Sequence, residues 1–329
     1  MSVLRSRLDT RGEEFRSNVG QMSAMWDEVA EQLASVPTIG GQRYVDRHRT
    51  RGKLLVRERI EALVDPHTPF LELSPLAAWG TQDPVGAGVV TGIGIVEGTE
   101  VAITGSDITY RGGSVNPTTL TKLSRFYEIV RQNRLPVISL NESAGADLPR
   151  QADIFVPGGA QFKHLTQLSR AGIPTITIGF GPATAGGAYV PGMSDYVVMV
   201  KDRATAYLGG PPLVKMAIDE VVDEESLGGA EMHSRTSGLS DYLAVDELDA
   251  LRIGRDIVAH LQWRKAGPGP TGPGDAPKYP VDELIGCASA DVRIPFDVRE
   301  VLARLLDGSR FEEFKPLYGD KLVCGWGEL

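Results

Sequence analysis

The stretch that decides the fold runs from Ile173 to Gly192 and reads IPTITIGFGPATAGGAYVPG. Residues 174–180 alternate Thr with Ile, a β-branched pattern that favours a buried strand. Gly181 and Pro182 end this strand, and the small residues at 185–188 predict the beginning of a short helix. The sequence therefore predicts a buried strand that runs directly into a glycine pair.

This glycine pair, Gly186 and Gly187, predicts a backbone oxyanion site. The first N–H groups of a helix have no partner within the helix, and a glycine has no Cβ that would keep a negatively charged oxygen away from them. The alternative interpretation is a tight strand-to-helix turn in which glycine is required only for packing.

Composition and charge exclude several classes of protein. With 329 residues, of which 42% are hydrophobic, the chain can bury on the order of three-quarters of its unfolded surface in one large domain or two. The formal net charge of -9 gives no electrostatic reason to expect nucleic acid or an anionic membrane as a partner.

The cysteines and the apolar runs indicate the compartment. Cys287 and Cys324 do not form a C-x-x-C pair, so neither a zinc ribbon nor a disulfide framework is indicated, and we expect no metal. The sequence contains neither about 18 uninterrupted apolar residues nor the apolar core of a signal peptide. We therefore expect a soluble, cytoplasmic protein.

The first part of the chain is predicted to contain helices and a β-hairpin. Residues 3–34 have a helical apolar period and predict one amphipathic helix or two, and residues 47–64 predict another that Asp65-Pro66 ends. Residues 88–104 predict a β-hairpin, and residues 117–133 predict a helix.

The middle of the chain repeats a strand, a small-residue loop and a helix. The strand at 136–140 runs into the loop 141–147, a helix is expected at 161–171, and the strand 174–180 follows. Such a repeat implies parallel strands whose loops emerge at the same sheet edge, where ligands bind in α/β folds. We therefore predict an α/β fold with a ligand site at this edge.

Glycine and proline mark a boundary near residue 266. Seven of the eight residues from Gly267 to Gly274 are Gly or Pro, which predicts a linker at 266–280 after a strand at 196–200 and helices at 213–218 and 246–263. The roughly 50 residues that follow, 281–329, are too few to bury a core alone by the usual scaling and resemble the incomplete start of a second domain.

Four ordered motifs carry a resemblance to a known family. They are ESAGADLPRQAD at 142–153, TAGGAYVP at 184–191, LGGPPLVK at 208–215, and LGGAEMH at 227–233 with SGLSD at 237–241. In order and spacing they resemble the signatures of the carboxyltransferase (β) subunit of biotin-dependent acyl-CoA carboxylases, and they are most similar to the methylcrotonyl-CoA type. The resemblance runs from about Gly52 to the end of the sequence.

This resemblance implies a fold, a reaction and a division of the chain. The implied fold is crotonase-like (ClpP/crotonase), a superhelix of stacked ββα units, with residues 1–265 as the N-terminal carboxyltransferase domain that holds the acyl-CoA half-site. Residues 281–329 would begin the C-terminal domain. The implied reaction transfers a carboxyl group from carboxybiotin to an acyl-CoA through a thioester enolate, which fixed N–H donors stabilise.

The resemblance also implies the site residues. In the family, the backbone of the pair that matches Gly186 and Gly187 forms an oxyanion hole. The neighbouring residues that would line the acyl-CoA site are Ser143, Ala144, Gly145, Ala146, Thr184, Ala185 and Ala188. The proton acceptor in the family is biotin itself, and we expect His233 to be a hydrogen-bonded structural residue rather than a base.

The expected partners follow from the same family. They are an acyl-CoA substrate and a biotin carboxylase or biotin carrier subunit that brings carboxylated biotin. We also expect a homo-oligomer, because the family forms hexamers. Asp147 replaces an aromatic residue that is frequent in methylcrotonyl-type chains, so the acyl group stays open. The alternatives are a truncated, non-catalytic half that binds acyl-CoA or assembles with partners, and a crotonase-type hydratase or isomerase that would need an acid–base pair.

Overall fold

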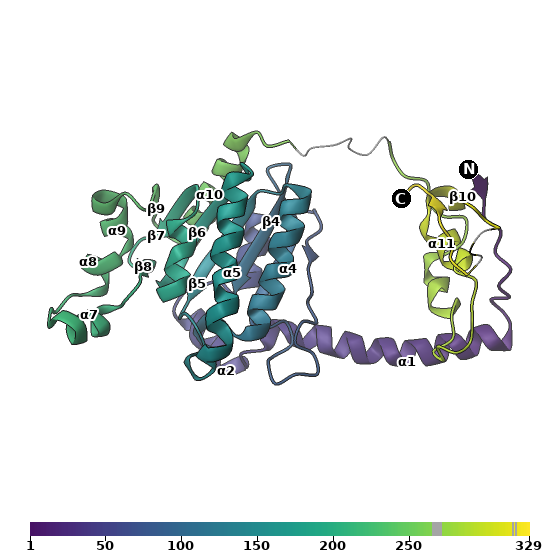
Figure 1. Ribbon diagram of the computed structural model, residues 1–329, viewed down its shortest axis with the longest axis horizontal. Coiled ribbons are helices and arrows are strands. Elements are labelled where there is room, and N and C mark those ends of the chain that lie inside the picture. The colour runs from purple at the N-terminus through teal and green to yellow at the C-terminus, as the bar shows by residue number, and fades with distance from the viewer. Residues whose placement is uncertain (265–271, 318, 320) are drawn as a thin grey trace. The chain divides into compact units, whose positions relative to one another are not determined.

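The computed structural model describes residues 1–264, 272–317, 319 and 321–329 (Figure 1). The chain forms two compact units, Gln32–Ala266 and the pair of segments Met1–Glu31 and Gly267–Leu329. The first 31 residues thus pack with the C-terminal segment, whereas the family resemblance implied one domain over residues 1–265. Of the predicted linker, residues 266–271 lie outside the described residues, and residues 272–280 contain neither helix nor strand.

The larger unit is built on an eight-stranded sheet in the order β2-β3-β4-β5-β6-β7-β9, with β8 paired to β6. The sheet begins with antiparallel pairs and becomes parallel from β4 onward. The strands are β2 (Leu71–Glu72), β3 (Val89–Val96), β4 (Thr99–Ser106), β5 (Val137–Ser143), β6 (Thr175–Thr184), β7 (Tyr196–Val200), β8 (Thr205–Tyr207) and β9 (Tyr242–Ala244). The expected hairpin is β3–β4, and both of its turn residues, Glu97 and Gly98, have positive φ, as the tightest hairpin turns require.

Each face of this sheet is covered by two helices. Alternate side chains of β5 and β6, such as Ile138 and Ile176, pack against α3 (Val56–Leu63) and α10 (Glu247–Leu261). Val137 points to the opposite face, which α4 (Pro117–Asn133) and α5 (Gln151–Arg170) cover, side by side in Figure 1. The Thr/Ile alternation therefore places isoleucine in one layer and threonine in the other.

The helix predicted at 117–133 has the predicted bounds, because both of its ends carry local signals. The Asn116 side chain accepts a hydrogen bond from the Thr119 N–H, and Pro117 occupies the first helical position. At the other end Arg134 adopts the left-handed conformation that closes many helices.

The helices predicted at 213–218 and 246–263 differ from α7 (Pro211–Ile218) and α10 by two residues or fewer at each end, but three other predicted helices differ more. The helix expected at 47–64 is two helices, α2 (Gln42–Thr50) and α3, separated around Gly52, whose φ of 65° ends the first. The helix expected at 161–171 is the second half of α5, which begins at Gln151. The helix expected at 3–34 is α1 (Glu13–Ser35), and the short strand β1 (Ser2–Val3) precedes it.

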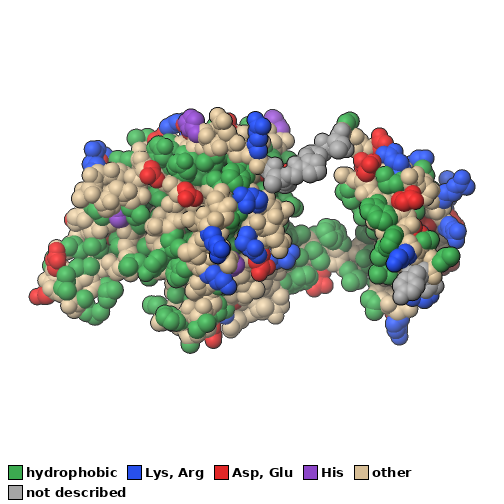
Figure 2. Space-filling view, turned by 45° about the horizontal axis from the view of Figure 1, so that its top comes forward, with side chains coloured by type: hydrophobic (Ala, Val, Ile, Leu, Met, Phe, Trp, Pro, Cys, Tyr) green, Lys and Arg blue, Asp and Glu red, His purple; other side chains and the backbone are tan. Residues whose placement is uncertain are grey.

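The remaining elements of the larger unit are short. The helices are α6 (Tyr189–Gly192), α7 (Pro211–Ile218), α8 (Glu224–Gly228) and α9 (Ala230–Met232). Single turns are η1 (Val36–Thr38), η2 (Arg111–Gly113), η3 (Leu148–Arg150), η4 (Ala185–Ala188) and η5 (His233–Ser237). At the end of the larger unit that carries α7 and α8, Figure 2 shows hydrophobic side chains at the surface beside acidic ones.

The smaller unit contains a three-stranded antiparallel sheet of β1, β10 (Arg310–Glu313) and β11 (Gly325–Trp326). Its other elements are α11 (Arg299–Leu305), η6 (Val281–Gly286) and η7 (Asp307–Ser309). The fully buried Arg304 pairs with Glu283 and Glu300, so an ion-pair cluster forms part of its centre. Among the described helices of the chain, we find none that combines the length and apolarity needed to cross a membrane.

Candidate functional site

The two predicted loops emerge from neighbouring parallel strands, β5 and β6. Asn141 pairs with Gly179, but Ser143 pairs with Ala183, so the single residue Glu142 on β5 faces three residues on β6. This offset is a β-bulge near the carboxyl ends of the strands. Gly181 and Pro182 were expected to end the strand, but β6 continues through them to Thr184, so that expectation is wrong. The expectation that both loops share one sheet edge is confirmed.

The first loop, residues 143–146, is held from one side by η2. The Ser143 hydroxyl donates to the Gly113 carbonyl at 2.9 Å and accepts from the Gly145 N–H at 3.1 Å. The Ala144 N–H donates to the Gly112 carbonyl at 3.0 Å. Because this N–H already has a partner, Ala144 offers its small side chain rather than a backbone donor. Gly112 and Gly113 were not singled out from the sequence.

The second loop is η4 followed by α6, so the helix expected after the glycine pair is present. Ala185 has a φ of 53°, which is uncommon for a residue with a side chain and re-aims the chain as it leaves β6. A Cβ on Gly186 would meet no heavy atom within 4 Å, whereas a Cβ on Gly187 would lie 3.7 Å from the Cβ of Ser143. The glycine pair therefore leaves its backbone approachable.

The structure brings most of the predicted site residues together. A Cβ on Gly145, whose φ is 92°, would lie 3.4 Å from the Thr184 carbonyl oxygen and 4.0 Å from the Cβ of Ala185. At the far ends of the loops, Ala146 forms a bridge with Val115, and Ala188 ends η4. The two loops thus lie against each other through Ser143, Gly145, Thr184, Ala185 and Gly187.

A cavity of about 330 Å³ adjoins the first loop through Ala144, and Pro182 brings β6 to its wall, whereas residues 184–188 do not line it. Its walls come from α2 and the segment after it, from the loop before η2, and from the ends of β5 and β6. They are lined by Tyr44, Arg47, His48, Arg51, Lys53, Ile108, Thr109, Gly112, Glu142, Ala144 and Pro182. The sequence predicted a helix from residue 47 but gave no signal that it lies at the site.

The cavity wall on α2 is cationic, and His48 within it favours the neutral state. Burial lowers the pKa of His48, against the opposing effect of its hydrogen bond to a carbonyl. Its Nε2–H donates to the Leu54 carbonyl at 3.0 Å. The positive charge of the wall therefore comes from Arg47, Arg51 and Lys53.

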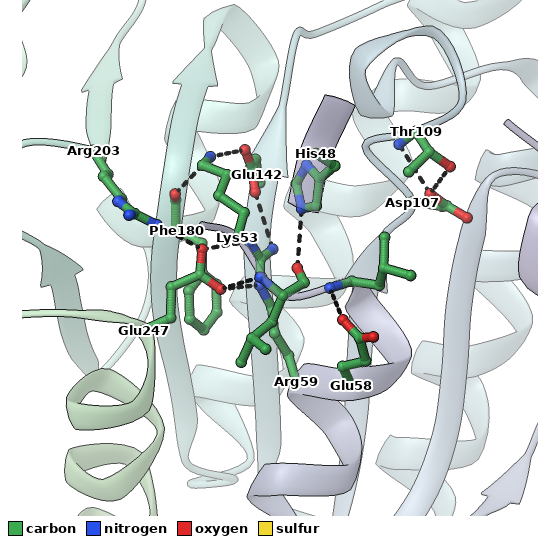
Figure 3. A network of polar contacts seen from close by, with 12 residues as sticks. His48, Lys53, Glu58, Arg59, Asp107, Thr109, Glu142, Phe180, Arg203 and Glu247 are labelled. Atoms are coloured by element: carbon green, nitrogen blue, oxygen red, sulfur yellow. Dashed lines mark hydrogen bonds and ion pairs between the residues drawn. The ribbon is translucent and has the colours of Figure 1, made fainter. Parts of the chain in front are cut away.

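A buried network of charged side chains lies behind the cavity (Figure 3). Arg59, 1% exposed, donates to Glu142 at 3.0 Å and to both carboxylate oxygens of Glu247 at 2.9 and 3.0 Å. Its guanidinium lies 4.2 Å from the centre of the Phe180 ring. Lys53 donates to Glu142 and to the Phe180 carbonyl. Sequence reasoning missed Lys53 and Arg59, because their partners are distant along the chain.

The other polar residues of the motifs have structural partners. His233 donates from Nε2 to the Ala206 carbonyl at 2.8 Å and accepts from the Ser237 hydroxyl at Nδ1, so its structural role is confirmed. Asp147 pairs with Arg111 at 2.8 Å, and Arg150 pairs with Asp83. In the described ranges, no group of three or more His, Cys, Asp or Glu side chains is arranged to hold a metal ion.

Comparison with curated proteins gives long matches. A probable biotin-dependent acyl-coenzyme A carboxylase beta2 subunit of Mycobacterium tuberculosis is 58% identical over 327 residues, which are 99% of this chain and 62% of that protein. The mitochondrial methylcrotonoyl-CoA carboxylase beta chain of Dictyostelium discoideum is 44% identical over 335 residues, covering 100% of this chain and 57% of that protein. The chain thus spans about three-fifths of the length of the curated relatives it matches.

Solved structures agree with these matches. The beta subunit of Pseudomonas aeruginosa geranyl-CoA carboxylase superposes with a TM-score of 0.90 at 40% identity, over 98% of this chain and 61% of that one. Transcarboxylase 12S superposes with a TM-score of 0.69 at 29% identity, over 93% of this chain and 61% of that one. The expected crotonase-like α/β fold is confirmed.

The motifs, the paired loops and the sheet all fall within one matched region. The family model for the carboxyl transferase domain matches residues 47–329, which include the end of α2, both loops and the smaller unit's C-terminal segment. Since this match covers most of the sequence and agrees with the relatives and the fold, the chain belongs to the carboxyl transferase family.

Proposed function

We propose that this chain provides the acyl-CoA half-site of a biotin-dependent acyl-CoA carboxylase, in which a carboxyl group passes from carboxybiotin to the acyl-CoA. The observation that carries the proposal is the pairing of the loops 143–146 and 184–188 beside a cavity with a cationic wall. The similarity to transcarboxylase 12S supports it, because that protein was solved with methylmalonyl-coenzyme A bound.

The glycine pair stabilises the charge that develops during the reaction. Loss of the α-proton turns the thioester into an enolate, and the backbone N–H groups of Gly186 and Gly187 donate to its oxygen at the start of η4. Each fixed donor of this kind contributes roughly 2.7–4 kcal/mol. Ser143, which faces Gly187, keeps the approach narrow without filling it.

The cavity receives the anionic part of the substrate. Coenzyme A carries phosphate groups, and guanidinium groups bind phosphate oxygens with paired, charge-assisted hydrogen bonds. Arg47 and Arg51 on the cavity wall supply this chemistry, and Ala144 on the same wall belongs to the loop that lies against the glycine pair, where the thioester is accepted.

The loop carboxylates are already committed to ion pairs. Glu142 is paired with Lys53 and Arg59, and Asp147 with Arg111, so neither is a free general base. This argues against a hydratase or isomerase, which needs an acid–base pair on the loops. Carboxylated biotin, when bound, supplies the carboxyl group, and we assign the proton acceptor to it on family resemblance.

The proposal extends to partners and compartment. We assign a biotin carboxylase or biotin carrier subunit as the source of carboxybiotin. We also assign self-association into a homo-oligomer, by analogy with transcarboxylase 12S, which was solved as a hexamer assembly. A cytoplasmic location is supported by the free thiols of Cys287 and Cys324.

Calorimetric titration of the chain with an acyl-CoA series tests the site. Methylcrotonyl-, propionyl- and acetyl-CoA, with free CoA as a reference, are titrated into the wild-type chain and into Gly187→Val. The valine side chain extends beyond the Cβ position that lies 3.7 Å from Ser143 and covers the N–H groups, so we expect acyl-CoA affinity to fall about ten-fold or more.

The matched control is Gly20→Val, the same substitution at an exposed position of α1 where a Cβ meets no atom within 4 Å. Its affinity should equal that of the wild type. Equal affinities for Gly187→Val and Gly20→Val, with unchanged circular dichroism, would remove the glycine pair from the site.

A further inference from the structure

The β-bulge between β5 and β6 sets how the two loops face each other. Three residues of β6, from Phe180 to Pro182, lie opposite Glu142 alone, so the second loop begins further along β6 than a regular ladder would place it. A bulge interrupts the ladder and leaves backbone groups without their usual strand partners. At this bulge the Phe180 carbonyl accepts a hydrogen bond from the Lys53 ammonium at 3.1 Å.

The side chain of Glu142 fills the inside of the bulge. A Cβ on Gly181 would lie 2.4 Å from the Oε1 atom of Glu142, so only glycine leaves room for the carboxylate there. The same oxygen accepts from the Lys53 ammonium. Lys53 therefore contacts both sides of the bulge, Glu142 on β5 and Phe180 on β6, as Figure 3 shows.

The buried carboxylate of Glu142 depends on the positive charges of its partners. Glu142 is almost completely buried and would be costly to leave unpaired. Arg59 donates a hydrogen bond to the second carboxylate oxygen of Glu142. Arg59 also donates to Glu247, which in addition accepts a hydrogen bond from the Leu54 N–H. Removing the Lys53 charge leaves two buried carboxylates around one buried guanidinium, because the other cation at Glu247, Arg203, lies 3.4 Å away and its side chain is 34% exposed.

We propose that Lys53 is a positioning residue that fixes the bulge, and through it the facing geometry of the loops 143–146 and 184–188. The residue follows Gly52 at the end of the α2 segment, and its side chain, 15% exposed, lies in the cavity wall with Arg47 and Arg51. It thereby links the cationic wall to the strand ends. The effect on acyl-CoA affinity rests on the proposed function; the effect on the loops does not.

Hydrogen exchange of the ligand-free chain tests the positioning role directly. Lys53→Met keeps the length of the side chain and removes the ammonium group. We expect exchange in residues 141–147 and 180–188 to accelerate about ten-fold, the effect of losing a charge-assisted hydrogen bond, while β3 and β4 keep wild-type protection. Acyl-CoA affinity should fall together with loop protection.

The matched control is Lys201→Met, which removes a partly exposed ammonium paired with Glu231 at 3.2 Å in the same unit. It should leave loop exchange and affinity unchanged. A loss of affinity in Lys53→Met without faster loop exchange would overturn the positioning role in favour of direct ligand contact. Unchanged exchange and affinity would overturn it as well.

A second variant tests the same contact from β6. The methyl group of Gly181→Ala displaces the Glu142 carboxylate and so separates it from Lys53 with every charge retained. Gly181→Ala should accelerate exchange in the same loop segments as expected for Lys53→Met, and it provides the test if Lys53→Met does not fold. Wild-type loop exchange in Gly181→Ala would contradict the proposal. If the wild-type chain binds no acyl-CoA while both variants loosen the loops, the positioning role stands and the proposed function fails.

Discussion

Lys122 is a buried cation in the larger unit whose partners are all neutral carbonyl groups. The residue lies on α4, is 4% exposed, and donates to the carbonyl oxygens of Gly86 and Val89 at 3.2 and 2.7 Å. Burial lowers its pKa from 10.5 to about 8, although Glu72 nearby opposes this shift. The folded protein therefore releases this proton more easily than the unfolded chain does.

This shift predicts that the free energy of unfolding rises with pH above 8. Between pH 8 and 10.5 the unfolded chain still binds the Lys122 proton whereas the folded chain has lost it, so stability increases by up to about 1.4 kcal/mol per pH unit. Urea unfolding of the wild type and of Lys122→Met at pH 7.5 and 9.5 measures the difference.

Comparison with the variant cancels the other groups that titrate nearby. Burial raises the pKa of Tyr127 to about 12 and raises that of Cys287, and both shifts lower stability as the pH rises. Because both proteins contain these groups, their contributions cancel in the comparison. As the pH rises, the free energy of unfolding of the wild type should therefore increase relative to that of Lys122→Met. Parallel pH profiles would mean that Lys122 titrates normally.

At the residue scale, local sequence signals predicted the two loops but not the buried charged side chains that contact Glu142 beside them. Gly186, Gly187 and the segment 143–146 were found because glycine and alanine directly follow β-branched strands. Lys53 and Arg59 gave no such signal, since their contacts with Glu142 join positions 89 and 83 residues apart. Pairing at that separation depends on the completed sheet.

At the scale of elements, α5 shows why the start of a helix can be missed. Its first half contains Pro157, Gly158 and Gly159, which predict a break, yet the helix continues from Gln151 through them. Tertiary packing overrides the propensity: Ile154 is buried ahead of the glycines, and Leu165 and Leu168 are buried beyond them. The opposite error occurs at Gly52. The region around it has a helical apolar period that predicts one continuous helix, but the positive φ of Gly52 ends α2 there.

The glycines of α5 therefore offer stabilising substitutions. At Gly158 and Gly159 a Cβ meets no atom within 4 Å and the backbone is helical, so alanine reduces only the entropy of the unfolded chain. We expect each substitution to add about 1 kcal/mol and to raise the midpoint of thermal unfolding by roughly 2–4 °C.

Gly172, two residues beyond the end of α5, is the matched control. A Cβ there also meets no atom within 4 Å, but its φ is 63°. Gly172→Ala should therefore lower the midpoint, because a side chain is strained in this conformation. If all three alanine variants shifted the midpoint in the same direction, backbone conformation would not be the deciding factor.

At the scale of the whole molecule, the grouping of distant segments was beyond local sequence patterns. Residues 1–31 join residues 267–329, since β1 pairs with β10 and Ser6 donates to Glu300 at 2.6 Å. A two-residue strand has no period that identifies its partner. The four ordered motifs, in contrast, predicted the family and the crotonase-like fold, because they depend on order along the chain rather than on contacts.

The larger unit also exposes an apolar surface, which we define as the α7 patch: Leu213, Met216, Ile218 and Val221, between 49% and 80% exposed. Contiguous exposed apolar residues mark interaction sites in soluble proteins. We therefore predict self-association through this patch.

Light scattering across a concentration series should give a mass above that of one chain for the wild type and a lower mass for Met216→Glu, whose charge would be buried unpaired at the contact. Leu248→Glu, at a similarly exposed position on α10, should behave as the wild type does. A wild-type chain that stays monomeric throughout, or equal masses for the two variants, would contradict the role of the patch.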